Sequence, residues 1–110
     1  MTDEASEHRR FPRFPARHTA LVRTIDAEAE GFGRTNVVSV GGCGVLTREE
    51  IPAGVAVELL MTIDRRVVQV VGRTVYARPV EDGLIEVGVE FLDVADEDVE
   101  LLRETLEGRA

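Results

Sequence analysis

The chain has 110 residues, 44% hydrophobic and 31% charged, which is typical of one soluble globular domain. Its net charge of −8 at pH 7 argues against a protein that binds nucleic acid through bulk positive charge. Because Cys43 is the single cysteine, an internal disulfide and a cysteine-based zinc site are excluded. The two histidines are not accompanied by the further ligands that a metal site needs.

The N-terminal part divides into an acidic tail over residues 1–8 and an arginine-rich arm over residues 9–17. No apolar stretch follows the tail, so no signal peptide is expected and the predicted location is the cytoplasm. All 13 basic residues of the chain are arginines, and five of them lie between Arg9 and Arg23 with no acidic residue among them. Pro12 and Pro15 favour extended backbone in the arm.

Residues 18–107 are predicted to form one domain that begins with short strands. The expected strands cover residues 18–25, 35–40, 44–47, 55–63, 66–77 and 84–91. The expected turns cover residues 27–33, 41–42, 51–54, 64–65 and 81–83, and Gly72 is expected to form a β-bulge. Several short strands separated by turn signals predict a mainly β sandwich or barrel.

The hydrophobic period changes near the C-terminus. Val99, Leu102 and Leu106 recur at helical spacing, which predicts one helix over about 96–107 with Asp96 as its N-cap. The apolar face of this helix either packs on the barrel or pairs with a partner helix, so the chain is expected to be a monomer or a dimer.

Two short motifs occur on this β-rich chain. Residues 9–13 contain an R-x-x-x-R pattern, in which Arg9 and Arg13 are the pair and Arg10 lies beside them. Residues 38–45 contain most of a D/N-x-S-x-x-G pattern, with Ser39 and Gly42 in place. Together with segments 72–75 and 87–91 and a terminal helix, this ordered set resembles the PilZ domain family over nearly the whole chain.

The resemblance implies a six-stranded antiparallel β-barrel with one C-terminal helix, and a ligand, cyclic di-GMP, on which the arm closes. An arginine fork pairs bidentately with phosphate, matches guanine O6 and N7, and stacks on a base. The resemblance therefore implies a ligand site made of Arg9, Arg10, Arg13, Ser39, Gly41 and Gly42, with no metal and no other cofactor. Ser39 would donate its hydroxyl to a phosphate oxygen, or it would bond its own backbone.

The second motif departs from the family pattern at one position. Val37 stands where the motif has an acid or an amide, and valine cannot accept hydrogen bonds from the N1 and N2 edge of guanine. Asn36 is one residue earlier, on the opposite face of a regular strand, so only a local bulge would let it take over this role. Weakened binding is expected, because a lost charge-assisted hydrogen bond costs about 1.5–3 kcal/mol.

Two functions follow from the resemblance. In the first, the chain is a non-enzymatic cyclic di-GMP receptor that acts in trans on a protein partner in motility, biofilm, secretion or transcription control. In the second, it is a degenerate PilZ-like adaptor that ignores the nucleotide. The acidic body disfavours a third, general RNA or polyanion binding, so no DNA or RNA partner is expected. The longest apolar runs are far too short for a membrane span, so no membrane insertion is expected. Cys43 is expected to be a small buried residue rather than a nucleophile.

Overall fold

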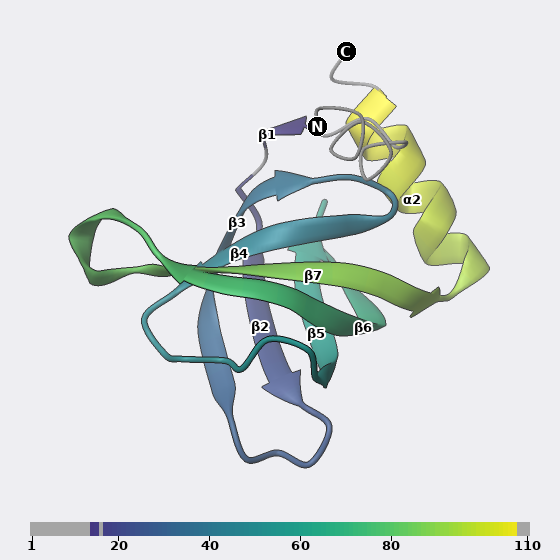
Figure 1. Ribbon diagram of the computed structural model, residues 1–110. Coiled ribbons are helices and arrows are strands. Elements are labelled where there is room, and N and C mark those ends of the chain that lie inside the picture. Colours follow the sequence, from purple (N-terminus) through teal and green to yellow (C-terminus); the bar gives the residue numbers. More distant parts are fainter. Residues whose placement is uncertain (1–13, 16, 108–110) are drawn as a thin grey trace, which may run out of the picture.

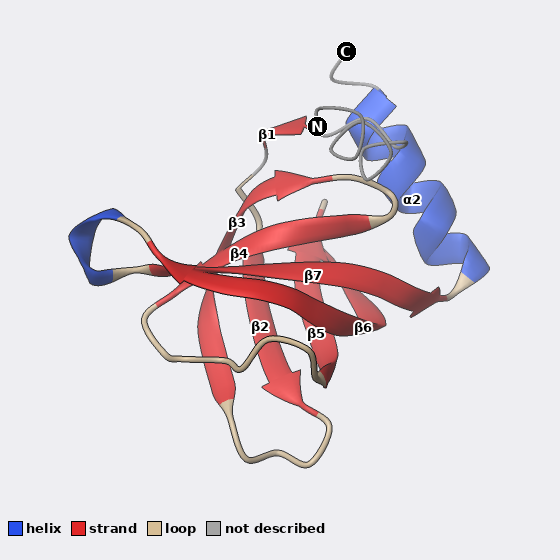
Figure 2. Ribbon diagram, viewed as in Figure 1, coloured by secondary structure: helices blue, strands red, loops and turns tan. Residues whose placement is uncertain are grey.

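Six antiparallel strands close into a barrel in the computed structural model, which describes residues 14–15 and 17–107 (Figure 1). The strands are β1 (Phe14–Pro15), β2 (Thr19–Thr24), β3 (Glu30–Val38), β4 (Gly42–Thr47), β5 (Ala56–Ile63), β6 (Arg66–Pro79) and β7 (Ile85–Val94). The helices are the short 3-10 helix η1 (Glu81–Gly83) and α2 (Asp96–Glu107) (Figure 2). The predicted six-stranded antiparallel barrel with one C-terminal helix is confirmed.

The barrel has the strand order β3-β2-β5-β6-β7-β4, and pairing between β3 and β4 closes it. β1 is an additional two-residue strand, in which Phe14 pairs with Val38 and Pro15 with Val37 of β3. Because β4 occupies one edge of β3, β1 and β2 pair in succession along its other edge.

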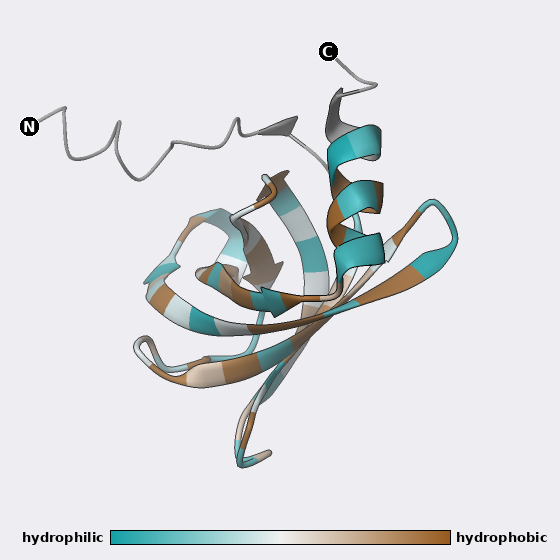
Figure 3. Ribbon diagram, turned by 90° about the vertical axis from the view of Figure 1, so that its right-hand side faces the viewer, coloured by the Kyte–Doolittle hydropathy of each residue, from teal (hydrophilic) through white to brown (hydrophobic). Residues whose placement is uncertain are grey.

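The core follows from the alternation of apolar and polar residues along the strands, visible in Figure 3 as alternating colours. Side chains from β2 to β7 fill the barrel, and Leu102 of α2 is fully buried with them. The buried apolar residues are Ala20, Val22, Val38, Cys43, Val45, Ile51, Val57, Leu59, Met61, Ile63, Val68, Val70, Val87, Val89 and Leu102. Of the two expectations for the helix, its packing on the barrel is therefore confirmed.

One local prediction is confirmed, and a second is confirmed only in part. Asp64 and Arg65 form the tight turn between β5 and β6, and both have positive φ angles, 50° and 68°. The pairing of β6 with β7 does shift register beside Gly72, but the extra residue is in β7: Val71 pairs with Asp93 and Gly72 with Phe91, which leaves Leu92 as the bulged residue. A second shift, between Thr74 and Tyr76, was not predicted.

Two other local predictions are wrong. The turn expected over 27–33 ends earlier, because Glu30 already pairs with Arg23 in the β2–β3 hairpin. The glycines that suggested a turn allow close packing instead, and a Cβ at Gly33 would lie 1.8 Å from the carbonyl oxygen of Leu46. The N-cap of α2 is Ala95 rather than Asp96, since Ala95 O accepts the first helical hydrogen bond from Val99 N at 3.0 Å.

Candidate functional site at the bulge in β3

The bulge that the second motif needs is present in β3. Thr35 pairs with Val45, but the next pair is Val37 with Gly44, so Asn36 is the extra residue. Thr35 and Val38 are fully buried, whereas Asn36 and Val37 are both only partly buried. The bulge therefore presents Asn36 and Val37 together on the outer face of the barrel, opposite Gly44.

The side-chain amide of Asn36 is only half satisfied. Its Nδ2 donates a hydrogen bond of 2.8 Å to Oε2 of Glu86, whereas Oδ1 is buried and accepts none within the described part of the chain. An ionised carboxylate only accepts, so the NH2 group must face Glu86 and the carbonyl cannot. A buried acceptor without a donor costs about 1–3 kcal/mol.

Glu86 fixes this orientation of the amide because it is ionised. Its side chain is only 9% exposed, and Arg78 donates to its Oε1 from Nη2 at 2.7 Å and from Nε at 2.9 Å. Burial by itself would raise the pKa of Glu86, but the hydrogen bonds from Asn36 and Arg78 outweigh burial and hold the pKa below its usual range.

Two glycines make room for this cluster on the outer face. A Cβ at Gly44 would lie 2.5 Å from Asn36 Oδ1, and a Cβ at Gly88 would lie 2.2 Å from the ring of Tyr76. The Arg78 guanidinium lies 5.1 Å from the centroid of the Tyr76 ring, a cation–π distance. Sequence reasoning missed this cluster, because the register across β4, β6 and β7 assembles it and no motif marks it.

Ser39 organises the turn between β3 and β4. Its Oγ accepts hydrogen bonds of 3.1 Å from both Gly41 N and Gly42 N, and it donates to Gly42 O at 3.2 Å. The structure thus shows the hydroxyl bonding its own backbone, the second of the two roles expected for it. Gly42 is required by close packing, since a Cβ there would lie 2.5 Å from the carbonyl oxygen of Val89.

Phe14 and Pro15 of the arm pair with β3 beside this turn. Arg9, Arg10 and Arg13 lie outside the described residues, but Arg13 directly precedes Phe14, which pairs with Val38 next to Ser39. Two further arginines are exposed near the bulge: Arg17, which precedes β2, and Arg34, which lies two residues before Asn36. Thr35 N donates to His18 O at 2.8 Å, which keeps residue 17 alongside the bulge.

The remaining candidate chemistry is absent from the described residues. Cys43 is buried, and burial raises the pKa of its thiol to about 12, so it is not a reactive thiolate at neutral pH. Within residues 14–15 and 17–107 no three histidine, cysteine or acidic side chains form a metal-binding group. In the same ranges, no helix has the length and hydrophobicity needed to cross a membrane.

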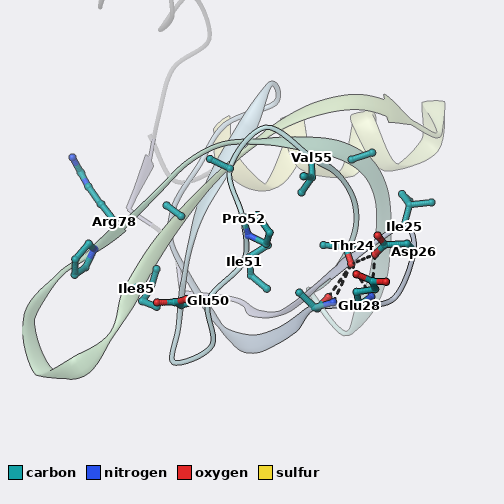
Figure 4. Close-up of a pocket in the computed structure, with 15 residues that line it drawn as sticks. Thr24, Ile25, Asp26, Glu28, Glu50, Ile51, Pro52, Val55, Arg78 and Ile85 are labelled. Carbon is teal, nitrogen blue, oxygen red and sulfur yellow. Dashed lines mark hydrogen bonds between the residues drawn. The ribbon is translucent and has the colours of Figure 1, made fainter.

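A cavity lies at the other end of the barrel. It has a volume of about 870 Å³ and is lined by the β2–β3 turn, the segment before β5, and the ends of β6 and β7. In Figure 4, Thr24, Asp26 and Glu28 lie across the opening from Arg78, with Ile51 and Pro52 between them. None of the described motif residues lines it, although Arg78, which pairs with Glu86 beside Asn36, does.

A closed six-stranded barrel with a bulged motif at one end and a terminal helix defines a small class of β-barrel domains. The family model of the PilZ domain matches residues 7–108, and the chain therefore belongs to the PilZ domain family. This confirms the family resemblance seen in the sequence. The comparison with curated proteins gave no significant match.

Solved structures show the same fold at low sequence identity. The chain is similar to the inhibitor of motility MotI/DgrA of Bacillus subtilis, with a TM-score of 0.76, 15% identity, and coverage of 92% of this chain and 51% of that one. It is also similar to the PilZ domain of YcgR from Escherichia coli, solved with c-di-GMP, with a TM-score of 0.68, 19% identity and coverage of 91% and 89%. The chain also covers 45% of a longer YcgR structure, solved in complex with c-di-GMP. It therefore spans about half the length of both the MotI/DgrA structure and this YcgR structure.

Proposed function

We propose that this chain is a non-enzymatic cyclic di-GMP receptor that works in the cytoplasm and acts in trans on a protein partner. The proposed ligand site is made of Arg9, Arg10, Arg13, Asn36, Ser39, Gly41 and Gly42. Membership of the PilZ family supports the ligand class, since the matching structure of a YcgR PilZ domain contains c-di-GMP.

The observation that carries this proposal is the unpaired carbonyl of Asn36. Guanine presents N1–H and N2–H2 as donors on one edge, and Asn36 Oδ1 is an acceptor with no donor among the described residues. The bulge brings this acceptor to the face where the family pattern has its acid or amide, at Val37. Asn36 thus replaces the missing group, although a neutral amide accepts less strongly than a carboxylate.

The positive charges beside Asn36 support binding of the phosphates. Arg34 lies two residues before Asn36, residue 17 is held alongside the bulge, and both arginine side chains are exposed. Together with Arg9 and Arg13 of the arm they would surround a ligand with two phosphates by guanidinium groups. Ser39 contributes through the turn that it holds, which presents the backbone of Gly41 and Gly42.

Calorimetric titration of the purified chain tests this proposal. Cyclic di-GMP should bind and cyclic di-AMP should not, because adenine lacks the N1–H and N2–H2 donors that Asn36 Oδ1 needs. Asn36→Leu should weaken cyclic di-GMP binding about 10- to 100-fold, the loss expected for one hydrogen bond to a buried group. Gln69→Leu, an amide-to-leucine change on the exposed face of β6, is the matched control and should leave the affinity unchanged.

The alternative function is an adaptor that recognises a protein partner without the nucleotide. The engagement of the Ser39 hydroxyl by its own turn favours it, since no hydroxyl hydrogen is left for a phosphate. If the chain is an adaptor, calorimetry should detect no heat of binding with cyclic di-GMP, even at ligand concentrations 100-fold above the dissociation constant of an ordinary receptor. It also predicts that partner binding survives the Arg9→Ala/Arg13→Ala substitution.

A further inference from the structure

At the cavity end of the barrel, β6 extends beyond the strand that pairs with one of its edges. β5 begins at Ala56, opposite Arg73, whereas β6 continues to Pro79 and pairs over its last residues with β7 alone. The chain before β5 leaves the line of that strand, and Ile51 is buried in the core. Among the described residues, no strand therefore pairs with the second edge of β6 over residues 75–79.

The backbone of Ala77 faces this open edge. Val80 N donates a hydrogen bond of 2.9 Å to Leu84 O, which makes their pair a hydrogen-bonded one. In an antiparallel ladder such pairs alternate with pairs that exchange no hydrogen bonds. Ala77 pairs with Val87 three positions further along the same register, so its N–H and C=O point away from β7. The C=O of Pro79, which follows the same alternation, points the same way.

The open edge of β6 borders the cavity. Ala77 lies directly opposite Val87, whose side chain is fully buried, so the side chain of Ala77 also points to the inner side of the hairpin. In Figure 4, Ile51 and Pro52 lie between this hairpin and the β2–β3 turn. Most of the lining is apolar, and includes Ile25, Ile51, Pro52, Val55, Pro79 and Ile85. The cavity thus combines an apolar surface with unpaired backbone groups.

The charge of the lining is predominantly negative. Asp26, Glu28 and Glu50 all line the cavity, and all three are exposed. Arg78 is the one basic residue in the described lining, and its guanidinium is already paired with Glu86 at 2.7 Å. A positively charged occupant is therefore complementary to this cavity.

We propose that the cavity binds an extended segment of a partner protein, which joins β6 at Ala77 as an added strand and carries basic and apolar side chains. In strand addition, backbone hydrogen bonds provide affinity and the surrounding side chains provide specificity. Pro79 has no N–H, which limits the added strand to a few hydrogen bonds and makes the complex weak and reversible. The inference rests on the proposed function only in assuming a protein partner.

A peptide titration tests strand addition. The probe is an end-blocked, fluorescein-labelled octapeptide of alternating arginine and valine, and fluorescence anisotropy measures its binding to the full chain without cyclic di-GMP. The same peptide with two central valines N-methylated keeps every charge but loses backbone donors, and should bind about 10-fold more weakly. A peptide of alternating glutamate and valine should not bind. No binding of the arginine peptide at millimolar protein, or equal binding of the methylated one, overturns the proposal.

Two substitutions at Ala77 test the position of the added strand. Ala77→Pro removes the N–H that faces the cavity but no hydrogen bond to β7, and should weaken binding of the arginine peptide about 2- to 10-fold. Ala77→Thr keeps the N–H and is the matched control, with affinity close to that of wild type. Thermal unfolding confirms that both variants are folded. Equal affinity of the two variants contradicts strand addition at Ala77.

Neutralisation of two acids tests the charge of the cavity. Glu28→Gln/Glu50→Gln should weaken binding of the arginine peptide about 2- to 10-fold at low salt, as expected for two exposed ion pairs. Glu97→Gln/Glu104→Gln on α2 changes the net charge by the same amount and should leave the affinity unchanged. Equal losses in the two variants would show attraction by bulk charge and overturn the proposal. Since these assays contain no nucleotide, their failure leaves the titration with cyclic di-GMP unaffected.

Discussion

The two ends of β3 are built alike but differ in what they leave unsatisfied. At the start of β3, Thr24 Oγ1 accepts hydrogen bonds of 3.1 Å from Glu28 N and Ala29 N and donates to Asp26 Oδ1 at 2.7 Å. At its end, Ser39 Oγ accepts from two glycine amides in the same manner. A hydroxyl that holds a turn is therefore common to both ends and by itself indicates no ligand.

The two ends differ in the features that could bind a ligand. The Thr24 end has the cavity of about 870 Å³, walled largely by apolar side chains. The Ser39 end has the buried, unpaired carbonyl of Asn36 and exposed arginines. For a charged ligand the second is the better indication, because polar complementarity rather than volume decides where two phosphates and a guanine edge bind.

The largest expected effect concerns the arginine arm. Arg9→Ala/Arg13→Ala should lower the affinity for cyclic di-GMP by more than 100-fold, since each charge-assisted hydrogen bond contributes about 1.5–3 kcal/mol. Arg48→Ala, at the cavity end, is the control and should change the affinity less than 2-fold. Calorimetry measures the affinity of both variants. Equal losses of affinity in the arm variant and the control would contradict the assignment of the ligand to the Ser39 end.

A pair of core substitutions should separate stability from binding. Ile51→Ala at the cavity end removes a side chain that is 1% exposed and should cost about 2–4 kcal/mol of unfolding free energy without changing ligand affinity. Gly42→Ala should cost a similar amount, because its Cβ would clash with Val89 O, and it should also weaken binding by displacing the turn. Urea denaturation measures the loss of stability of each variant, and calorimetric titration of the folded fraction measures its ligand affinity. A large loss of affinity in Ile51→Ala would contradict the separation of stability from binding.

The smallest expected effect is a dependence of stability on pH through Glu86. The pKa of this carboxyl is lower in the folded chain than its ordinary value of 4.5, so its stabilising contribution is present above pH 4.5. That contribution is lost as the pH falls through the lower, folded-state pKa. Glu86→Gln should therefore flatten the decline of thermal stability between pH 5 and about 3, and an unchanged slope would show that Glu86 is not held ionised by Asn36 and Arg78.

Sequence patterns were sufficient for the elements but not for the site. Strand alternation and the helical spacing near Leu102 predicted the strands and the terminal helix, because burial of one face imposes those periods. The R-x-x-x-R and S-x-x-G motifs were enough to indicate the family. The division into tail, arm and domain, and the ligand role of Arg9, Arg10 and Arg13, remain predictions.

The apparent defect at Val37 shows where prediction from the sequence stopped. A regular strand places Asn36 and Val37 on opposite faces, and the sequence contains no local signal for the bulge between Thr35 and Val37. The position of Asn36 depends on Gly44 in β4, whose missing side chain leaves space for the amide. It depends equally on Glu86 in β7, 50 residues away, which orients the amide.

The sequence by itself therefore determined the elements, the family and the residue types available for a dinucleotide. Those follow from local periodicity and from motifs that are contiguous in the chain. Only the tertiary structure decided that Asn36 faces outward together with Val37, and which atom of the Asn36 amide is left without a partner. Both depend on strand register, which is fixed by packing between segments far apart in the sequence.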